Sequence, residues 1–180
     1  MCHTGNLKAA IYSLTLALAC APGVSAQEGP LLPGGASSLT ETYGDWHVAC
    51  QVREAVICCA MSQQQLRQDG QRIVTVELKN APDDTLAANF VLPFGLQLDA
   101  GATLRMDEQP AMAPLRFHTC LPAGCVVQAN FDSATVTTLH GGTKLHVTTK
   151  TADTEQDFAI AISLNGFTAA FDRLKALTAS

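Results

Sequence analysis

DWHVACQV, residues 45–52, and AVICCAMSQQQ, residues 55–65, are two neighbouring stretches that indicate the fold class of this chain. In the first stretch, apolar residues at positions 46, 48, 50 and 52 alternate with polar or small ones. Side chains two positions apart share one face of a β-strand, so the alternation predicts a strand with one buried face. The second stretch places Cys58 beside Cys59, and adjacent strand residues point to opposite faces. One bonding partner therefore cannot serve both cysteines.

Further short strands are predicted along the chain, separated by turn-forming segments such as NAPDD, DAG, LPAG and HGG. They lie at residues 72–78, 89–93, 95–98, 103–107, 114–120, 125–131, 144–150 and 157–164. Regularly spaced short strands with one buried face are typical of an antiparallel β-sandwich.

Two segments depart from this pattern and predict helices. In DSATVTTLHGG, residues 132–142, Asp132 or Ser133 can cap the first N–H groups, and Gly141 is placed to end a short helix. In NGFTAAFDRLKAL, residues 165–177, apolar residues recur at helical spacing. The second helix is expected to lay its apolar stripe, including Phe171, against the sheet. The sequence thus predicts a mainly β fold with a short internal helix and a C-terminal helix.

The N-terminal segment is predicted to be an export signal. Met1–Ala26 has a polar start with Lys8, then an apolar run and a small-residue cleavage site, Val24-Ser25-Ala26. Cleavage after Ala26 predicts a protein of the periplasm, the outer surface or the medium. A lipoprotein signal acylated at Cys20 is the minor alternative.

The mature chain is predicted to hold a flexible arm and one domain. Residues 27–39 are rich in Pro, Gly and Ser and lack periodicity, and residues 40–178 have the size of a single domain. Later apolar runs are far shorter than the roughly 20 residues that a membrane-spanning helix needs. Ten scattered basic residues against sixteen acidic ones give a net charge of −6, which argues against nucleic acid or an anionic membrane as partner.

Five cysteines remain after cleavage, and an exported chain meets an oxidising compartment. Cys120 and Cys125 flank a turn containing Pro122 and Gly124, so a hairpin can bring them within disulfide distance. The alternative is a zinc site formed by this pair with His118 and either Cys50 or Cys59. Export favours the disulfide.

No motif for catalysis or cofactor binding is found, and no cofactor or metal is predicted. The histidines at 47, 118, 140 and 146 have no signalled nucleophile beside them and are interpreted as solvated or capping residues. The acidic pairs at 83–84 and 107–108 are interpreted as turn residues, and the methionines at 61, 106 and 112 as packing residues. The glutamines at 63–65 are interpreted as ordinary surface.

Five motifs occur in an order that resembles the invasion-associated locus B family of exported bacterial proteins. They are Gly44-Asp45-Trp46 with Cys50, a cysteine followed by Ala-Met-x-Gln, Leu92-Pro93-x-Gly95, the cysteine pair at 120 and 125, and Ser163-Leu164-x-Gly166-Phe167. The resemblance runs from about Tyr43 to Leu174. It implies an immunoglobulin-like β-sandwich and a role in bacterial entry into host cells, and it brings no catalytic residue.

The resemblance also bears on the adjacent cysteines. The family pattern has one cysteine before Ala-Met-x-Gln, which corresponds to Cys59, so Cys58 is additional. A hairpin from residue 50 to 59 can place Cys59 opposite Cys50. We therefore expect the disulfides Cys50–Cys59 and Cys120–Cys125, with Cys58 a free thiol in a monomer or the link of a covalent dimer.

Three functions remain open. The first is a non-enzymatic exported module that binds a protein in the envelope or at a host surface through loops at the ends of the sandwich. The second is an envelope maintenance or assembly factor. The third is an enzyme whose site is assembled from dispersed residues, with Cys58 as a possible nucleophile. The residues that carry the resemblance are of scaffold types, which favours a binding module.

Overall fold

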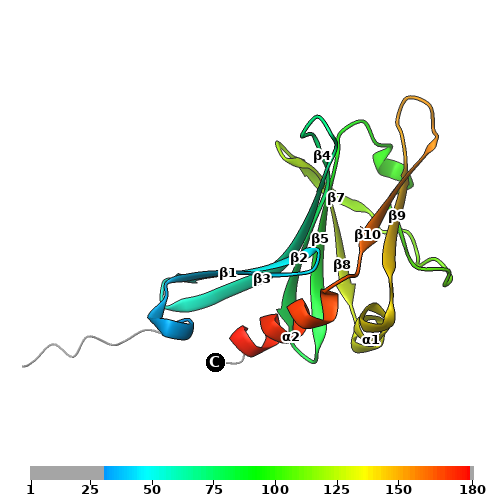
Figure 1. The fold of residues 1–180 in the computed structure, drawn as a ribbon. Helices are drawn as coiled ribbons and strands as arrows, with labels where there is room; N and C mark the ends of the chain where they lie inside the picture. Colours follow the sequence, from blue (N-terminus) through cyan, green and yellow to red (C-terminus); the bar gives the residue numbers. More distant parts are fainter. Residues whose placement is uncertain (1–30, 179–180) are drawn as a thin grey trace, which may run out of the picture.

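The computed structural model describes residues 31–178, whose strands form two antiparallel sheets packed as a sandwich (Figure 1). The larger sheet has seven strands in the order β1-β2-β3-β4-β5-β8-β7, and the smaller has three in the order β10-β9-β6. The predicted mainly β fold, an antiparallel immunoglobulin-like sandwich with two helices, is confirmed.

The strands are β1 (Ser38–Tyr43), β2 (Trp46–Arg53), β3 (Val56–Leu66), β4 (Arg72–Ala81), β5 (Thr85–Leu92), β6 (Thr103–Met106), β7 (Phe117–Leu121), β8 (Gly124–Phe131), β9 (Lys144–Lys150) and β10 (Asp157–Ser163). The helices are the 3₁₀ turns η1 (Pro33–Gly35) and η2 (Leu98–Ala100) and the α-helices α1 (Ser133–Gly141) and α2 (Phe167–Thr178).

The stretch 45–65 forms the hairpin of β2 and β3, and its register follows the apolar alternation. Val48 pairs with Met61 and Cys50 with Cys59, and all four side chains are buried on the inner face of the sheet. The apolar residues of β4, β5 and β8 continue this face, so one contiguous core lies between the sheets and under the helices. Strands β1, β2 and the first half of β3 extend beyond the sandwich as a three-stranded projection (Figure 1).

Helix α2 covers the inner face of the large sheet near this projection (Figure 1). Its buried residues are the five predicted from helical spacing: Phe167, Ala170, Phe171, Leu174 and Leu177. Phe167 meets Trp46 of β2 edge to face, with ring centroids 5.6 Å apart. Aromatic pairs of this geometry add about 1 kcal/mol beyond their buried area, so the contact helps to hold α2 against the sheet.

Helix α1 begins as predicted. The Asp132 side chain accepts a hydrogen bond from the backbone N–H of Thr135 at 2.8 Å and caps the helix. Hydrogen bonds from the Thr135 side chain and from its backbone N–H lower the pKa of Asp132, because they stabilise the ionised carboxylate.

Two expectations differ from the structure. Residues 95–98, predicted as a strand, form only a single bridge between Leu96 and Thr151, after which the chain turns into η2. The flexible arm predicted for residues 27–39 holds defined structure from residue 31 on, because Leu32 is buried in the core beside α2 and β1 begins at Ser38. Strand β1 was not predicted because its sequence, SLTETY, consists mainly of Ser, Thr and Glu and shows no clear alternation of large apolar residues.

The predicted signal peptide, its Ala26 cleavage site, the alternative lipoprotein Cys20 and residues 27–30 of the arm lie outside the described residues. Within residues 31–178, no helix has the length and apolar character needed to cross a bilayer.

Candidate functional site

Two disulfides are present where the sequence predicts them. Cys50 joins Cys59 across β2 and β3, with Cα atoms 4.1 Å apart, and Cys120 joins Cys125 across β7 and β8 at 3.9 Å. In each case the two cysteines are direct partners in the register of the hairpin. Sulfur atoms bonded to each other do not act as thiolate ligands, so the alternative of a zinc site on these cysteines is contradicted. Among the described residues, no group of three His, Cys, Asp or Glu side chains is arranged to hold a metal ion.

Cys58 is the free cysteine of residues 31–178 and is exposed. It pairs with Gln51 on the outer face of the projection, opposite the face that carries the buried Cys59. The structure therefore separates the adjacent cysteines as strand geometry requires, one into the core and one toward solvent. Among the described residues, the Cys58 side chain makes no hydrogen bond to an acid or a base.

Two of the three glutamines of β3, Gln63 and Gln65, join the two sheets, which corrects their interpretation as ordinary surface; Gln64 is exposed as expected. Gln63 is buried, and its side-chain amide pairs with the backbone of Ser163 in β10: the Nε2 group donates to the Ser163 carbonyl at 3.0 Å, and the Ser163 N–H donates to Oε1 at 3.2 Å. Gln65 Nε2 donates to the carbonyl of Ala161 at 2.7 Å. The Trp46 indole also donates to the Ser163 carbonyl, at 3.0 Å. Side-chain amides thus take the place of a neighbouring strand along the edge of β10.

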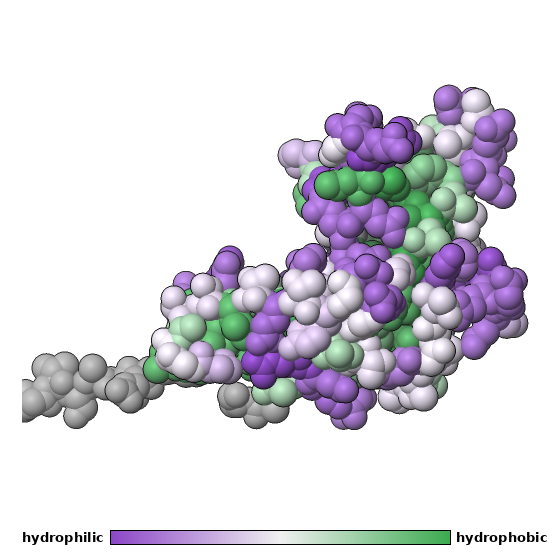
Figure 2. Space-filling model, viewed as in Figure 1, coloured by the Kyte–Doolittle hydropathy of each residue, from purple (hydrophilic) through white to green (hydrophobic). Residues whose placement is uncertain are grey.

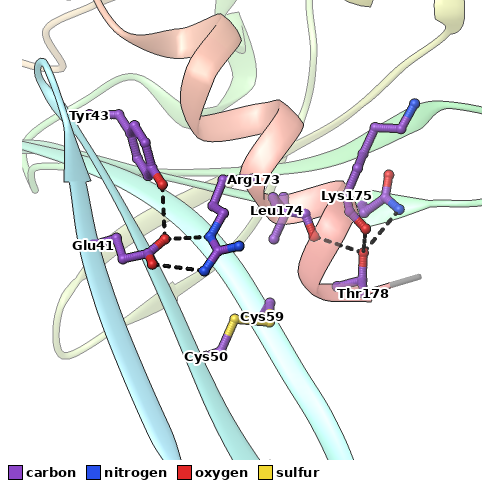
Figure 3. The surroundings of a disulfide bond; sticks show 9 residues. Glu41, Tyr43, Cys50, Cys59, Arg173, Leu174, Lys175 and Thr178 are labelled. Carbon is purple, nitrogen blue, oxygen red and sulfur yellow. Dashed lines mark hydrogen bonds and ion pairs between the residues drawn. A yellow bond between two sulfur atoms is a disulfide. The ribbon is translucent and has the colours of Figure 1, made fainter. Parts of the chain in front are cut away.

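A half-buried ion pair joins β1 to α2 beside the Cys50–Cys59 disulfide (Figure 3). The Arg173 guanidinium donates to both carboxylate oxygens of Glu41, at 2.6 and 2.9 Å, and the Tyr43 hydroxyl donates to one of them at 2.9 Å. The hydrogen bond from Arg173 holds the pKa of Glu41 below its usual range, whereas burial and the bond to Glu41 raise the pKa of Tyr43. The cluster links β1 to α2 through a bidentate pair beside a disulfide, which indicates a structural role.

The remaining candidate residues serve local structure. The His47 ring bonds Thr42, and the His140 ring bonds Thr168 and packs on Phe167 and Phe171. The Asp107 carboxylate accepts the backbone N–H groups of Thr143 and Lys144, which lowers its pKa. Asp84 pairs with Lys175, and Met61 and Met106 are buried in the core. His118 and His146 make no side-chain hydrogen bond within residues 31–178. These positions do not converge on a catalytic centre.

The strongest candidate for a functional surface is the end of the sandwich at the top of Figure 1, which we call the loop end. It consists of four connections: residues 66–71, 93–98, 121–124 and 151–156. Hydrogen bonds hold them together. The Arg72 guanidinium donates to the Ala123 carbonyl, the Ala152 N–H to the Gly95 carbonyl at 2.8 Å, and the Gln97 N–H to the Lys150 carbonyl at 2.8 Å.

Large apolar side chains are exposed at this end. Leu66, Phe94, Leu98 and Leu121 are 45–62% exposed, and they are four of the six strongly exposed large apolar residues within residues 31–178. Figure 2 shows apolar surface beneath the polar tips of these loops. Loops of a scaffold commonly carry recognition, and clustered apolar exposure marks interaction surfaces.

A hollow of about 300 Å³ opens at the loop end between the two sheets. Its apolar wall is formed by Ile73, Pro93, Phe94, Leu96 and Phe158, and its polar wall by Arg67, Gln71, Arg72 and Thr151. Neither arginine forms an ion pair within the part of the chain that the structure describes. The site therefore combines apolar contact area with guanidinium groups available to a partner.

The sequence predicted recognition through loops at the ends of the sandwich but not which end or which residues, because the members of this site are separated by up to 90 positions and belong to four loops. The one available signal was the PFG segment at 93–95, which places an aromatic residue in a turn context where no core exists for it.

Comparison with known proteins places the chain in a family. Residues 46–175 match the family model of the invasion associated locus B (IalB) protein. An invasion protein B homolog of Brucella abortus is 46% identical over 148 residues, covering 82% of this chain and 85% of the relative. Invasion protein B of Bartonella bacilliformis is 30% identical over 169 residues, covering 93% and 91%. The crystal structure of invasion associated protein B from Bartonella henselae is similar, with a TM-score of 0.74, 32% identity, and coverage of 78% of this chain and 97% of that one. The chain therefore belongs to the invasion associated locus B family.

Proposed function

We propose that this chain is an exported, non-enzymatic protein that binds a host-cell surface component through its loop end. The observation that carries the proposal is the gathering of Leu66, Phe94, Leu98 and Leu121 at one end of a disulfide-braced sandwich. A monomeric protein has no structural use for such a cluster outside its core, and burial against a partner would remove it from water.

Two further points support the proposal. Relatives that share most of this chain are named as invasion proteins, and membership of their family makes a role at the host cell the natural expectation. Disulfide bonds persist in oxidising compartments, which is consistent with export through the predicted signal peptide and cleavage after Ala26. Residues 40–178 would then be the binding domain, with Arg67 and Arg72 contributing orientation through hydrogen bonds to acidic or carbonyl groups.

The test is binding of the purified, fluorescently labelled protein to erythrocytes and to epithelial cells, measured by flow cytometry. Replacing both Phe94 and Leu121 by serine should lower cell binding at least tenfold, because it removes two apolar contacts worth about 1–2 kcal/mol each. The matched control is Val56→Ser, which removes an apolar side chain of comparable exposure (57%, against 62% for Phe94 and 51% for Leu121) from the tip of the projection. Unchanged binding by the double variant would contradict the proposal.

The same variants separate the alternative functions. If the loop-end variant binds host cells normally but no longer binds isolated bacterial envelopes, the chain is an envelope factor. An enzyme would instead show activity in a hydrolase panel that Cys58→Ser abolishes. That outcome would replace the binding proposal with catalysis.

A further inference from the structure

The edges of the two sheets are covered to different degrees. An uncovered edge strand presents free N–H and C=O groups that can pair with another chain. In the small sheet, Gln63 and Gln65 cover the edge of β10. The edge of β6 is covered by the returning chain, where the Met112 N–H donates to the Leu104 carbonyl at 2.8 Å and Ala102 bridges Leu115.

Within residues 31–178, the two edge strands of the large sheet, β1 and β7, have no such cover, and of these β7 borders a groove. Strand β7 is the last strand of the seven-stranded sheet and pairs with β8 alone. Within residues 31–178, its backbone makes no hydrogen bond beyond that pairing, and residues 118–121 are exposed. The edge is therefore available along its whole length.

A groove of about 490 Å³ runs along this free edge. One wall consists of the consecutive residues 116–120, and the other of Leu98 and Asp99 from η2. The Ala102–Leu115 bridge joins the two chain segments that diverge to form these walls. A groove bounded by a strand on one side and an apolar side chain on the other has the form of a site for an additional strand.

We propose that this groove binds an extended peptide segment of a partner protein, which pairs with β7 as an eighth strand of the large sheet. Strand addition of this kind takes its affinity from backbone hydrogen bonds and its specificity from pockets for alternate side chains. Five residues of β7 correspond to about 17 Å of peptide at 3.4 Å per residue. Leu98 provides contact for an apolar side chain of that peptide.

Charge narrows the class of peptide. The exposed Arg116 and His118 line the strand side of the groove, and neither pairs with a carboxylate within residues 31–178. An acidic side chain of the incoming strand can accept hydrogen bonds from these two groups, provided that it lies on the β7 side and away from the Asp99 carboxylate of the opposite wall. The preferred peptide therefore alternates apolar residues with Asp or Glu. The groove is separate from the hollow between Phe94 and Phe158 but shares Leu98 with the loop end. Its test measures peptide binding alone and does not depend on binding to host cells.

The experiment is selection of capped ten-residue peptides from a phage-displayed library on the purified protein with both disulfides intact. The tightest peptide is then synthesised, and its contact surface is mapped by hydrogen exchange. We expect protection of the amides of residues 117–121. Two N-methylated versions of the peptide are compared, one modified at its odd-numbered residues and one at its even-numbered residues. We expect one version to lose binding and the other to bind within threefold of the parent, because only every second peptide N–H faces β7.

Two substitutions complete the test. Leu98→Asp and Arg116→Glu should each weaken binding of the selected peptide at least tenfold. Leu66→Asp, at a loop-end residue that is 56% exposed against 45% for Leu98, should leave the affinity for the peptide unchanged. The inference is overturned if the selected peptides protect residues other than 117–121, or if both N-methylated series bind as tightly as the parent. It is also overturned if β7 is occupied by a second copy of this chain, which sedimentation would show as a dimer that excludes the peptide.

Discussion

At the scale of single residues, Gln63 connects the two sheets through both polar atoms of its side chain. It is a buried amide on the inner face of a strand otherwise lined by Cys59 and Met61, and both of its polar atoms are satisfied by the backbone of Ser163. A buried peptide group without a partner costs about 1–3 kcal/mol. The residue therefore fixes how the small sheet sits against the large one.

Replacing Gln63 with alanine should lower the free energy of unfolding by about 2–3 kcal/mol, because the Ser163 N–H and carbonyl lose partners and a cavity remains. Urea unfolding followed by tryptophan fluorescence is the measurement, since Trp46 lies in the same seam. Gln64→Ala is the matched control. Its side chain is exposed and it should change stability by less than about 0.5 kcal/mol. Equal effects of the two substitutions would contradict the assigned role.

The lowered pKa of Glu41 predicts how the free energy of unfolding depends on pH. Its folded-state pKa is lowered from 4.5 by the hydrogen bond from Arg173. A carboxylate whose pKa is lower in the folded state contributes stability that is fully present above the unfolded pKa and is lost as pH falls through the folded one. Stability of the native protein should therefore fall below about pH 4.5, and Glu41→Gln should flatten part of that decline.

Unfolding midpoints in urea at pH 3, 4, 5 and 7 test this expectation. At pH 7 the substitution should cost about 1 kcal/mol, the upper range for a bidentate pair that retains some exposure to solvent. Glu108→Gln is the control, because Glu108 pairs with Arg105 at a fully exposed position. A pH profile of Glu41→Gln parallel to that of the native protein would show that the pair adds no stability.

At the scale of elements, two turns from distant parts of the sequence meet back to back. The turn between β1 and β2 contains Gly44, and the turn before α2 contains Gly166. The Asp45 N–H donates to the Asn165 carbonyl at 3.1 Å. A Cβ atom on Gly166 would lie 2.1 Å from the Tyr43 carbonyl oxygen, and Gly166 also has a φ of +83°. Only glycine allows this approach, which sets where α2 begins.

Gly166→Ala should destabilise the protein by more than about 3 kcal/mol, because it combines backbone strain with an overlap against immobile backbone. Gly70→Ala isolates the backbone strain, and the difference between the two variants gives the cost of the overlap. Gly70 has a similar φ of +80° but open space around it, so its substitution should cost only about 1–2 kcal/mol. Thermal unfolding by circular dichroism compares the two, and equal midpoints would mean that the turn contact is dispensable.

At the scale of the whole molecule, the two ends of the sandwich differ in how their apolar residues are covered. One end is closed by α1 and α2, whose apolar residues complete the core, and the other carries the exposed residues of the loop end (Figure 1). The disulfides brace the hairpins β2–β3 and β7–β8, and each contributes about 2–3 kcal/mol in the chain-entropy model.

Intact-mass analysis of the exported protein should show a chain that begins at Gln27, contains two disulfides and takes up one alkylating group at Cys58 without reduction. The physical basis is the exposure of Cys58 and the pairing of the other four cysteines. Cys58→Ser should remove the alkylation and leave the mass otherwise as expected. A lipid modification at Cys20 would contradict cleavage after Ala26, and a dimer that disappears in Cys58→Ser would show that the thiol links two chains.

Local regularities of the sequence were enough to predict most of the strands, both α-helices and the Cys120–Cys125 pair, but not β1. A strand with one buried face must alternate, as residues 46–52 do. The choice of Cys59 as the partner of Cys50 came from the family resemblance together with the expected hairpin, and the register of β2 and β3 confirms it. Features that depend on distant segments could not be predicted in this way. The pairing of Gln63 with Ser163 spans 100 positions, and the loop end assembles residues from 66 to 156. Their proximity follows from the packing of two sheets, since side-chain pattern reports which face of a strand is buried but carries no information about which backbone lies opposite it.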